Sequence, residues 1–132
     1  MKQELADELI TTFPDLYKNL RDHEFEFGDG WFLLIKDLSS QLISTSFFQN
    51  SLKDGKSPPS IIIIKEKFGH LCIAFDKQID KEILDLVQKF SILSEKTCEH
   101  CGQPGTIREP LSRRKRIKTL CVLCSTEYNQ HQ

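Results

Sequence analysis

The sequence predicts an α+β fold in which helices pack on a β-hairpin, followed by a short cysteine-rich tail. Three observations support this prediction. Apolar residues recur at helical spacing in three segments, a β-branched run precedes an alternating apolar run, and four of the five cysteines lie after residue 97. A chain of 132 residues accommodates one compact domain with a small appendage. We therefore expect an α+β domain in residues 1–97 and a tail in residues 98–132.

The first two helical segments are separated by a glycine-containing loop. Residues 5–13 space their apolar side chains for a helix, and Pro14 breaks or restarts it. The next segment begins at Trp31, and apolar residues recur along it at steps of three and four over about three helical turns. Asp29 stands just before it, where an N-cap side chain satisfies the first free amides. Residues 50–60, rich in glycine and proline, are expected to be a loop.

The centre of the chain carries the hairpin signal. Residues 60–67 are β-branched and apolar in their first half, residues 71–75 alternate, and Gly69 between them accepts a positive φ. The charged residues 65–67 are interpreted as a solvated edge that discourages pairing with other chains. A helix over residues 79–96 carries one apolar stripe, with which it can cover the hairpin.

Composition excludes several classes of protein. The apolar share of 39% is typical of a globular chain, and a net charge of −1 gives no global attraction to nucleic acid or membranes. The first residues lack the pattern of a secretory signal, and no segment has the roughly 18 to 20 apolar residues needed to span a bilayer. We therefore expect a cytoplasmic protein, in which cysteines serve as metal ligands or core residues rather than disulfides.

The strongest chemical signal is a pair of Cys-x-x-Cys motifs in the tail. Cys98 and Cys101 are followed by 19 residues and then by Cys121 and Cys124. Two residues between thiolates let both sulfurs of a tight turn face one ion, and two such turns complete a tetrahedral site. Gly102 allows the chain to curl directly after the first pair. This spacing predicts a zinc ribbon that binds one structural Zn²⁺.

Other interpretations of these cysteines are weaker. A redox Cys-x-x-Cys pair is expected at the start of a helix in a βαβ unit, and the sequence predicts no such unit. His100 or His131 could replace a thiolate, but four well-spaced cysteines leave no need for either. A catalytic zinc keeps one position open and usually has His or carboxylate ligands, so four thiolates predict a closed site that stabilises the tail.

Basic residues cluster between the two cysteine pairs. Residues 98–132 carry 6 basic and 3 acidic residues, a balance of +3, whereas residues 1–97 carry 12 and 16, a balance of −4. A basic loop at the tip of a ribbon can bind phosphates. A run of charged residues is, however, more often simply a solvent-exposed face, and no aromatic residue lies within this run to stack on bases. The candidate nucleic-acid-binding residues are Arg113, Arg114, Lys115, Arg116 and Lys118.

A catalytic alternative depends on the loop between the first two helical segments. His23, Glu24, Glu26 and Asp29 lie close in sequence and contain the groups of a general acid–base pair. No glycine-rich phosphate loop, nucleophile elbow or paired carboxylates at helical spacing accompany them. We therefore expect that the protein is not an enzyme and keep a small hydrolase built on this loop as an alternative.

Four segments form a further pattern: residues 27–32 (FGDGWF), 64–69 (IKEKFG), 97–105 (TCEHCGQPG) and 119–121 (TLC). In this order and spacing they resemble a family of small uncharacterised bacterial and prophage-encoded proteins. The resemblance implies a Trp-led helix, a hairpin, a long helix and a metal-binding tail whose last ligand is sometimes His. The chain departs from the family between the cysteine pairs, where relatives tend to carry Gly and Trp. A phage association makes interference with a host process an expectation.

These features together predict a non-enzymatic, zinc-stabilised binding module with a macromolecular partner. A protein partner or self-association is slightly favoured, because residues 1–97 are acidic and a short hairpin offers strand edges for pairing. The alternatives are nucleic-acid binding through the basic loop, a phage inhibitor that sequesters a host defence protein or signalling nucleotide, and the small hydrolase. No membrane partner is expected.

Overall fold

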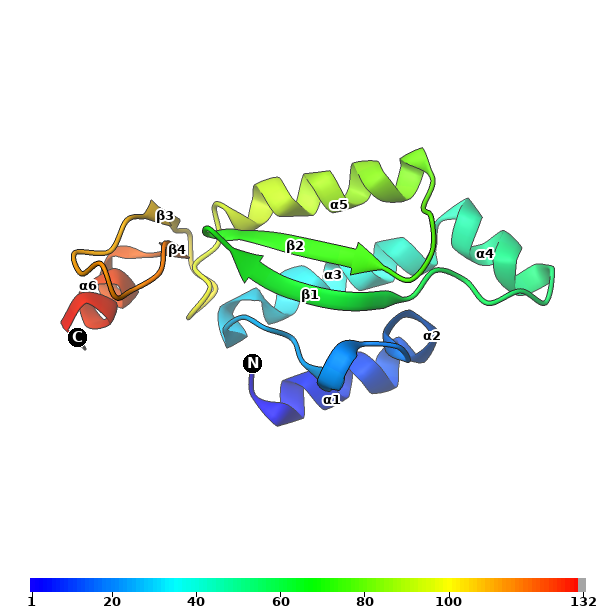
Figure 1. Ribbon diagram of the computed structural model, residues 1–132, viewed down its shortest axis with the longest axis horizontal. Coiled ribbons are helices and arrows are strands. Elements are labelled where there is room, and N and C mark those ends of the chain that lie inside the picture. Colours follow the sequence, from blue (N-terminus) through cyan, green and yellow to red (C-terminus); the bar gives the residue numbers. More distant parts are fainter. Residues whose placement is uncertain (131–132) are drawn as a thin grey trace.

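A computed structural model describes residues 1–130, and its ribbon shows helices around a β-hairpin with a smaller unit at one end (Figure 1). The predicted α+β class is confirmed, including the gathering of four cysteines in the tail. The domain boundary at residue 97 stays a prediction. The elements are α1 (Gln3–Thr12), α2 (Pro14–Tyr17), the 3₁₀ helices η1 (Arg21–His23) and η2 (Asp29–Trp31), α3 (Phe32–Ile43), α4 (Ser46–Lys53), β1 (Ile61–Lys67), β2 (His70–Phe75), α5 (Lys81–Ser94), β3 (Thr106–Arg108), β4 (Lys118–Leu120) and α6 (Val122–Gln130).

The hairpin β1–β2 occupies the middle of the larger part. Its strands pair antiparallel, and Lys67 lies opposite His70 at the tip. The turn consists of Phe68 and Gly69, which have positive φ angles of 53° and 86°, respectively. Positive φ at both central residues suits the right-handed twist of a two-residue hairpin. In Figure 1, α5 and α1 lie on opposite sides of the hairpin, α3 passes behind it, and the tip points toward the cysteine-rich tail.

A hydrophobic core fills the space between the hairpin and the helices. Trp31, Tyr17 and Phe90 are among its largest fully buried side chains, and burial of such a side chain contributes on the order of 2 kcal/mol. The Ser39 hydroxyl donates to the Ile35 carbonyl, so the Tyr17 hydroxyl, 2.5 Å from the Ser39 oxygen, acts as the donor in that pair. Burial raises the pKa of Tyr17, which keeps the phenol neutral.

Two local predictions are wrong. Asp29 does not cap α3, because the turn η2 delays the helix to Phe32; its Oδ1 instead accepts a 2.7 Å hydrogen bond from the backbone N–H of Lys2. Asp29 therefore supports the start of α1. The loop expected over residues 50–60 begins only after α4, whose N-cap Thr45 receives a hydrogen bond from the helix. The glycine and prolines that suggested a loop all follow this helix.

The tail forms a short ribbon followed by a helix. Strands β3 and β4 pair antiparallel, with Ile107 opposite Thr119. The basic loop, residues 109–117, joins them, and α6 begins two residues after β4. No side chain of α6 is buried within the described chain, and its first two residues, Val122 and Leu123, are exposed. The helix therefore lacks the apolar stripe by which sequence patterns reveal helices.

Candidate metal centre

Four cysteine sulfurs converge at the base of the ribbon. The Sγ atoms of Cys98, Cys101, Cys121 and Cys124 all lie within 4.8 Å of one another, and those of Cys101 and Cys121 are 3.7 Å apart. A tetrahedral ion with metal–sulfur bonds of about 2.3 Å requires sulfur–sulfur distances of about 3.8 Å. The cluster therefore has the size and the donor set to hold a metal ion.

Two tight turns bring these sulfurs together. In the first, Gly102 donates its backbone N–H to the Cys98 carbonyl at 2.9 Å, with a φ of +84° that glycine adopts without strain. In the second, the backbone N–H of Cys124 donates to the Cys121 sulfur at 3.4 Å. Cys121 directly precedes α6 and Cys124 lies in its first turn, a spacing of three that places both side chains on one helix face.

The neighbouring sulfurs affect one another's ionisation. The hydrogen bond from the backbone N–H of Cys124 lowers the pKa of the Cys121 thiol to about 7. Burial, reinforced by the other sulfurs, raises the pKa of the Cys124 thiol. Four thiolates at this distance repel one another, so complete deprotonation of the cluster requires a cation at its centre. The chemistry of the donor set therefore fits a metal ion.

The first knuckle, residues 98–102, packs directly against the segment that precedes α3. Gly30 donates its backbone N–H to the Glu99 carbonyl at 2.8 Å, and a Cβ at Gly30 would lie 2.2 Å from a carbonyl oxygen of the knuckle. The indole N–H of Trp31 donates to the Thr97 carbonyl at 2.8 Å. Glycine is required where two backbones approach this closely. The first knuckle is therefore attached to the larger part of the molecule.

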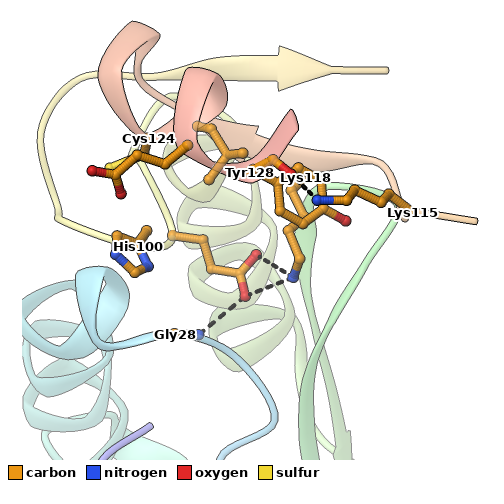
Figure 2. A pocket seen from close by; sticks show the side chains of 9 residues that line it. Gly28, His100, Lys115, Lys118, Cys124 and Tyr128 are labelled. Atoms are coloured by element: carbon orange, nitrogen blue, oxygen red, sulfur yellow. Dashed lines mark hydrogen bonds and ion pairs between the residues drawn. The ribbon is translucent and has the colours of Figure 1, made fainter. Parts of the chain in front are cut away.

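A series of ion pairs joins the first knuckle to the hairpin tip. The ammonium of Lys118 lies between two buried carboxylates, 3.2 Å from Glu99 and 3.7 Å from Glu66. Glu99 also accepts the backbone N–H of Gly28 at 3.0 Å, and Glu66 accepts that of Gly69 at 2.8 Å. Dashed lines in Figure 2 mark the bonds that connect Gly28 and Lys118 through the Glu99 carboxylate. Because an unpaired buried charge is costly, these partners are needed.

A cavity of about 530 Å³ lies between the first knuckle and α6 (Figure 2). On one wall, the Lys115 ammonium donates to the Tyr128 carbonyl and lies 4.5 Å from the centre of the Tyr128 ring. The Tyr128 hydroxyl accepts the Arg116 N–H at 2.8 Å and donates to the Arg116 carbonyl at 3.1 Å. These contacts attach the basic loop to α6. His100 lines the cavity rather than joining the sulfurs, and His131 lies outside the described residues.

The five basic residues singled out from the sequence fall into two groups. Arg113 and Arg114 are exposed, and no ion pair within residues 1–130 involves them. Arg116 is 70% exposed, although its guanidinium lies 3.4 Å from a buried carboxylate of β1. Lys115 and Lys118 are half-buried and hold the loop in place. The three arginines are therefore the accessible cations of this set.

The residues of the catalytic hypothesis are not gathered into a site. His23, Glu24 and Glu26 are exposed, and Asp29 is directed to the start of α1. Within residues 1–130, no hydrogen bond or ion pair joins these four side chains to one another. The small-hydrolase hypothesis gains no support from this geometry.

Sequence reasoning missed the residues that attach the tail, chiefly Gly30, Glu66 and Glu99. The interpretation of residues 65–67 as a solvated edge is wrong for Glu66, which is buried. A signal for this was present, because Glu66 follows Ile64 by two positions and so shares its face of the strand. The partners of Glu66 lie far along the chain, and no local pattern indicates them.

Comparisons with known proteins return no match: no family model, curated protein or solved structure matches the chain. The resemblance based on four sequence segments therefore stays a prediction. Within residues 1–130, no helix combines the length and apolar character needed to cross a membrane.

Proposed function

We propose that this protein is a non-enzymatic, zinc-stabilised binding module whose partner is a nucleic acid. The observation that carries the proposal is the position of the basic loop, where three arginines are exposed while Lys115 and Lys118 attach the loop to α6 and the hairpin. A loop held in this way keeps its charges in one place. It therefore loses less conformational entropy when a partner binds.

Zinc is the metal that this ligand set favours. Soft thiolate ligands in tetrahedral geometry are typical of structural zinc sites. When bound, zinc supplies the coordination bonds that close both turns, and four protein ligands leave no position for water or substrate. A closed site supports the non-enzymatic part of the proposal. Turnover of a nucleotide or phosphoester that His23→Ala abolishes, with the fold intact, would contradict it.

The hairpin edges give little support to a protein partner. Along β1, Glu26 donates its N–H to the Ile64 carbonyl at 3.1 Å and accepts the N–H of Glu66 at 3.1 Å. Along β2, the Leu71 N–H donates to the Ser94 hydroxyl at 2.9 Å. Each edge is therefore partly occupied by the chain's own groups, which leaves fewer free groups for strand addition. The exposed arginines favour an anionic partner instead.

The direct test is binding of generic DNA and RNA oligonucleotides by the zinc-loaded protein between about 50 and 200 mM salt. We expect affinity that falls steeply with salt. The double variant Arg113→Ser/Arg114→Ser should reduce the slope of log affinity against log salt by about 1.4 to 1.8, because each phosphate contact contributes about 0.7 to 0.9. Zinc content should be unchanged.

A matched control removes two exposed lysines at the other end of the molecule. Lys53 and Lys56 lie at and just after the end of α4, which Figure 1 places opposite the tail. The variant Lys53→Ser/Lys56→Ser loses the same net charge and should keep the original salt slope. Absence of binding to any nucleic acid at low salt, or an equal effect of both double variants, would refute the proposed partner.

A second candidate, a protein partner, is favoured by two exposed apolar side chains on the tail. Val122 and Leu123 are 68% and 79% exposed at the start of α6, directly between two metal ligands. Adjacent exposed apolar residues are typical of interaction surfaces when they belong to a larger patch. Sedimentation velocity over a concentration series tests self-association through them. Association that Val122→Ser/Leu123→Ser abolishes would support this candidate, and a monomer at every concentration would exclude self-association.

A further inference from the structure

A second hollow lies between the hairpin tip and the basic loop. We call it the basic groove; it has a volume of about 420 Å³ and is lined by Lys65, Glu66, Lys67, Phe68, Lys115, Arg116 and Ile117. We infer that the basic groove binds single-stranded nucleic acid and that Phe68 stacks on a base. This inference rests on the proposed function and specifies the strand form and the aromatic contact.

The charge of the groove is positive. Four of its lining residues are cations, and its one carboxylate, Glu66, is already paired with Arg116 and Lys118. Within residues 1–130, no ion pair involves Lys65 or Lys67. The groove therefore offers cations from two elements to a phosphate backbone, and neutralisation of phosphates by such cations dominates nucleic-acid affinity.

Phe68 is an unfavourable residue for the stability of the hairpin. Its side chain is 64% exposed, and its φ of +53° lies in the left-handed region that costs a residue with a Cβ roughly 1 to 2 kcal/mol. Asn, Asp or Gly is normally preferred at this position of a two-residue turn. Strained residues of this kind cluster at ligand sites. A strained, exposed aromatic residue beside a basic groove is therefore better explained by binding than by folding.

The combination of Phe68 with the cations selects the chemical class of the partner. The loop contains no aromatic residue of its own, and folding brings one to it from the hairpin. The Lys67 ammonium lies 5.8 Å from the centre of the Phe68 ring, so charge and aromatic surface are adjacent. Alternation of cations and aromatic side chains is typical of proteins that bind single strands, whose bases are free to stack. Bases of a duplex are already stacked on one another.

The test compares the zinc-loaded protein with its Phe68→Asn variant. The ligands are DNA and RNA single strands of about 12 nucleotides, a matched duplex, and polyglutamate of similar charge. Loss of stacking should lower the affinity for single strands about tenfold and leave duplex binding unchanged. Thermal stability should rise, because Asn tolerates positive φ at this turn. A rise in melting temperature with weaker binding separates a binding role of Phe68 from a structural one.

Two further variants strengthen the test. Phe68→Tyr retains an aromatic face and should bind single strands with nearly the original affinity. Lys65→Ser/Lys67→Ser should reduce the salt slope for single strands by about 1.4, since each contact contributes about 0.7. Lys53→Ser/Lys56→Ser again serves as the matched control.

The outcomes distinguish this inference from the proposed function. Single-strand binding that Phe68→Asn leaves unchanged would overturn the inference while the proposed function stands, and so would equal affinity for single strand and duplex. Binding of polyglutamate as tight as that of single strands would assign the groove to an acidic protein and overturn both. Absence of binding to every probe at low salt would also overturn both.

Discussion

Residues 1–97 and residues 98–130 are stabilised by different forces. Every member of the hydrophobic core lies between Ala6 and Phe90. The buried residues of the described tail are Cys98, Glu99, Thr119 and Leu120. Apolar burial, at about 25 cal/mol per Å², can stabilise the first part. So little is buried in the tail that we expect it to depend on metal coordination in addition to hydrogen bonds and ion pairs. The two parts should therefore respond differently to the same perturbation.

The junction between the two parts is polar rather than apolar. The Gly30 backbone N–H donates to the Glu99 carbonyl, and the Thr119 hydroxyl donates to the Gly69 carbonyl at the hairpin turn. Hydrogen bonds are directional, so such a junction fixes one orientation of the tail, whereas apolar contacts alone allow sliding. The basic groove requires this orientation, because one of its walls comes from each part.

The largest expected effect is that of metal removal. Chelation, or loss of one ligand in Cys101→Ser, should disorder residues 98–130 and leave the core of residues 1–97 folded. Structural zinc contributes about 10 to 16 kcal/mol in small zinc-dependent units, far more than the tail buries by other means. Heteronuclear NMR should show loss of dispersion for tail amides alone. Cys101 is suited to the test because it is exposed, so its replacement disturbs little packing.

The matched control for metal removal is Cys72→Ser. Cys72 is a half-buried thiol of β2 outside the sulfur cluster, so its replacement should leave metal content and the tail unchanged. A Cys101→Ser protein that keeps full metal affinity and an ordered tail would contradict the assignment. Collapse of the whole chain on chelation would show that the two parts do not differ as described.

The next largest effect is expected at Lys118. Lys118→Met leaves the buried carboxylates of Glu66 and Glu99 without the cation that they share. Removal of one partner from a buried ion pair costs about 3 to 5 kcal/mol, and here the cost should appear as detachment of the tail. Hydrogen exchange should accelerate in β4 and not in α3. The control Lys36→Met breaks an exposed ion pair with Glu8 and should change hydrogen exchange in neither β4 nor α3. Equal effects of the two variants would refute this role of Lys118.

Gly30→Ala tests the junction without altering any charge. The new Cβ would lie 2.2 Å from the Cys98 carbonyl oxygen and 2.6 Å from that of Glu99, so the knuckle must move. Such overpacking costs about 1 to 3 kcal/mol, and zinc affinity should fall because coordination and docking are coupled. Gly55→Ala provides the control: among residues 1–130, no atom lies within 4 Å of a Cβ there, so its strained φ affects only the local turn. Unchanged zinc affinity in Gly30→Ala would contradict the coupling.

The difference between the two parts also explains how far the sequence could predict the structure. The cysteine pairs, the hairpin and the helices of residues 1–97 follow local patterns, because thiolate spacing and apolar periodicity act over a few residues. The junction joins residues that are far apart in sequence, and its members resemble ordinary surface residues. Glu66 lies between two lysines, and Glu99 lies inside the knuckle. Periodicity indicates the buried face of Glu66, but only the folded chain shows that Lys118 neutralises it.

The position of Phe68 illustrates the same limit. In sequence it is one residue of a hairpin turn, and the basic loop, about 40 residues later, contains no aromatic side chain. Folding places both on the basic groove. A search for interleaved aromatic and basic residues along the chain therefore fails, because the interleaving exists only in space.

The smallest expected effect comes from replacing one tyrosine by phenylalanine in each of the two parts. Tyr17→Phe removes a buried hydroxyl that donates to Ser39, while the ring keeps its contact with Phe25, 4.9 Å between centroids. Loss of one such hydrogen bond should lower the free energy of unfolding of residues 1–97 by about 1 kcal/mol and leave zinc affinity unchanged. Urea denaturation of the zinc-loaded protein measures the first quantity, and competition with a chelator measures the second.

Tyr128→Phe is the matched change in the tail. It removes a hydroxyl that exchanges hydrogen bonds with the backbone of Arg116, so the basic loop should loosen while the core of residues 1–97 keeps its stability. Faster hydrogen exchange at Arg116, with an unchanged urea midpoint, is the expected result. If both tyrosine variants instead lower the urea midpoint equally, residues 1–97 and residues 98–130 unfold as one cooperative unit. The polar junction would then couple the two parts as strongly as a shared hydrophobic core.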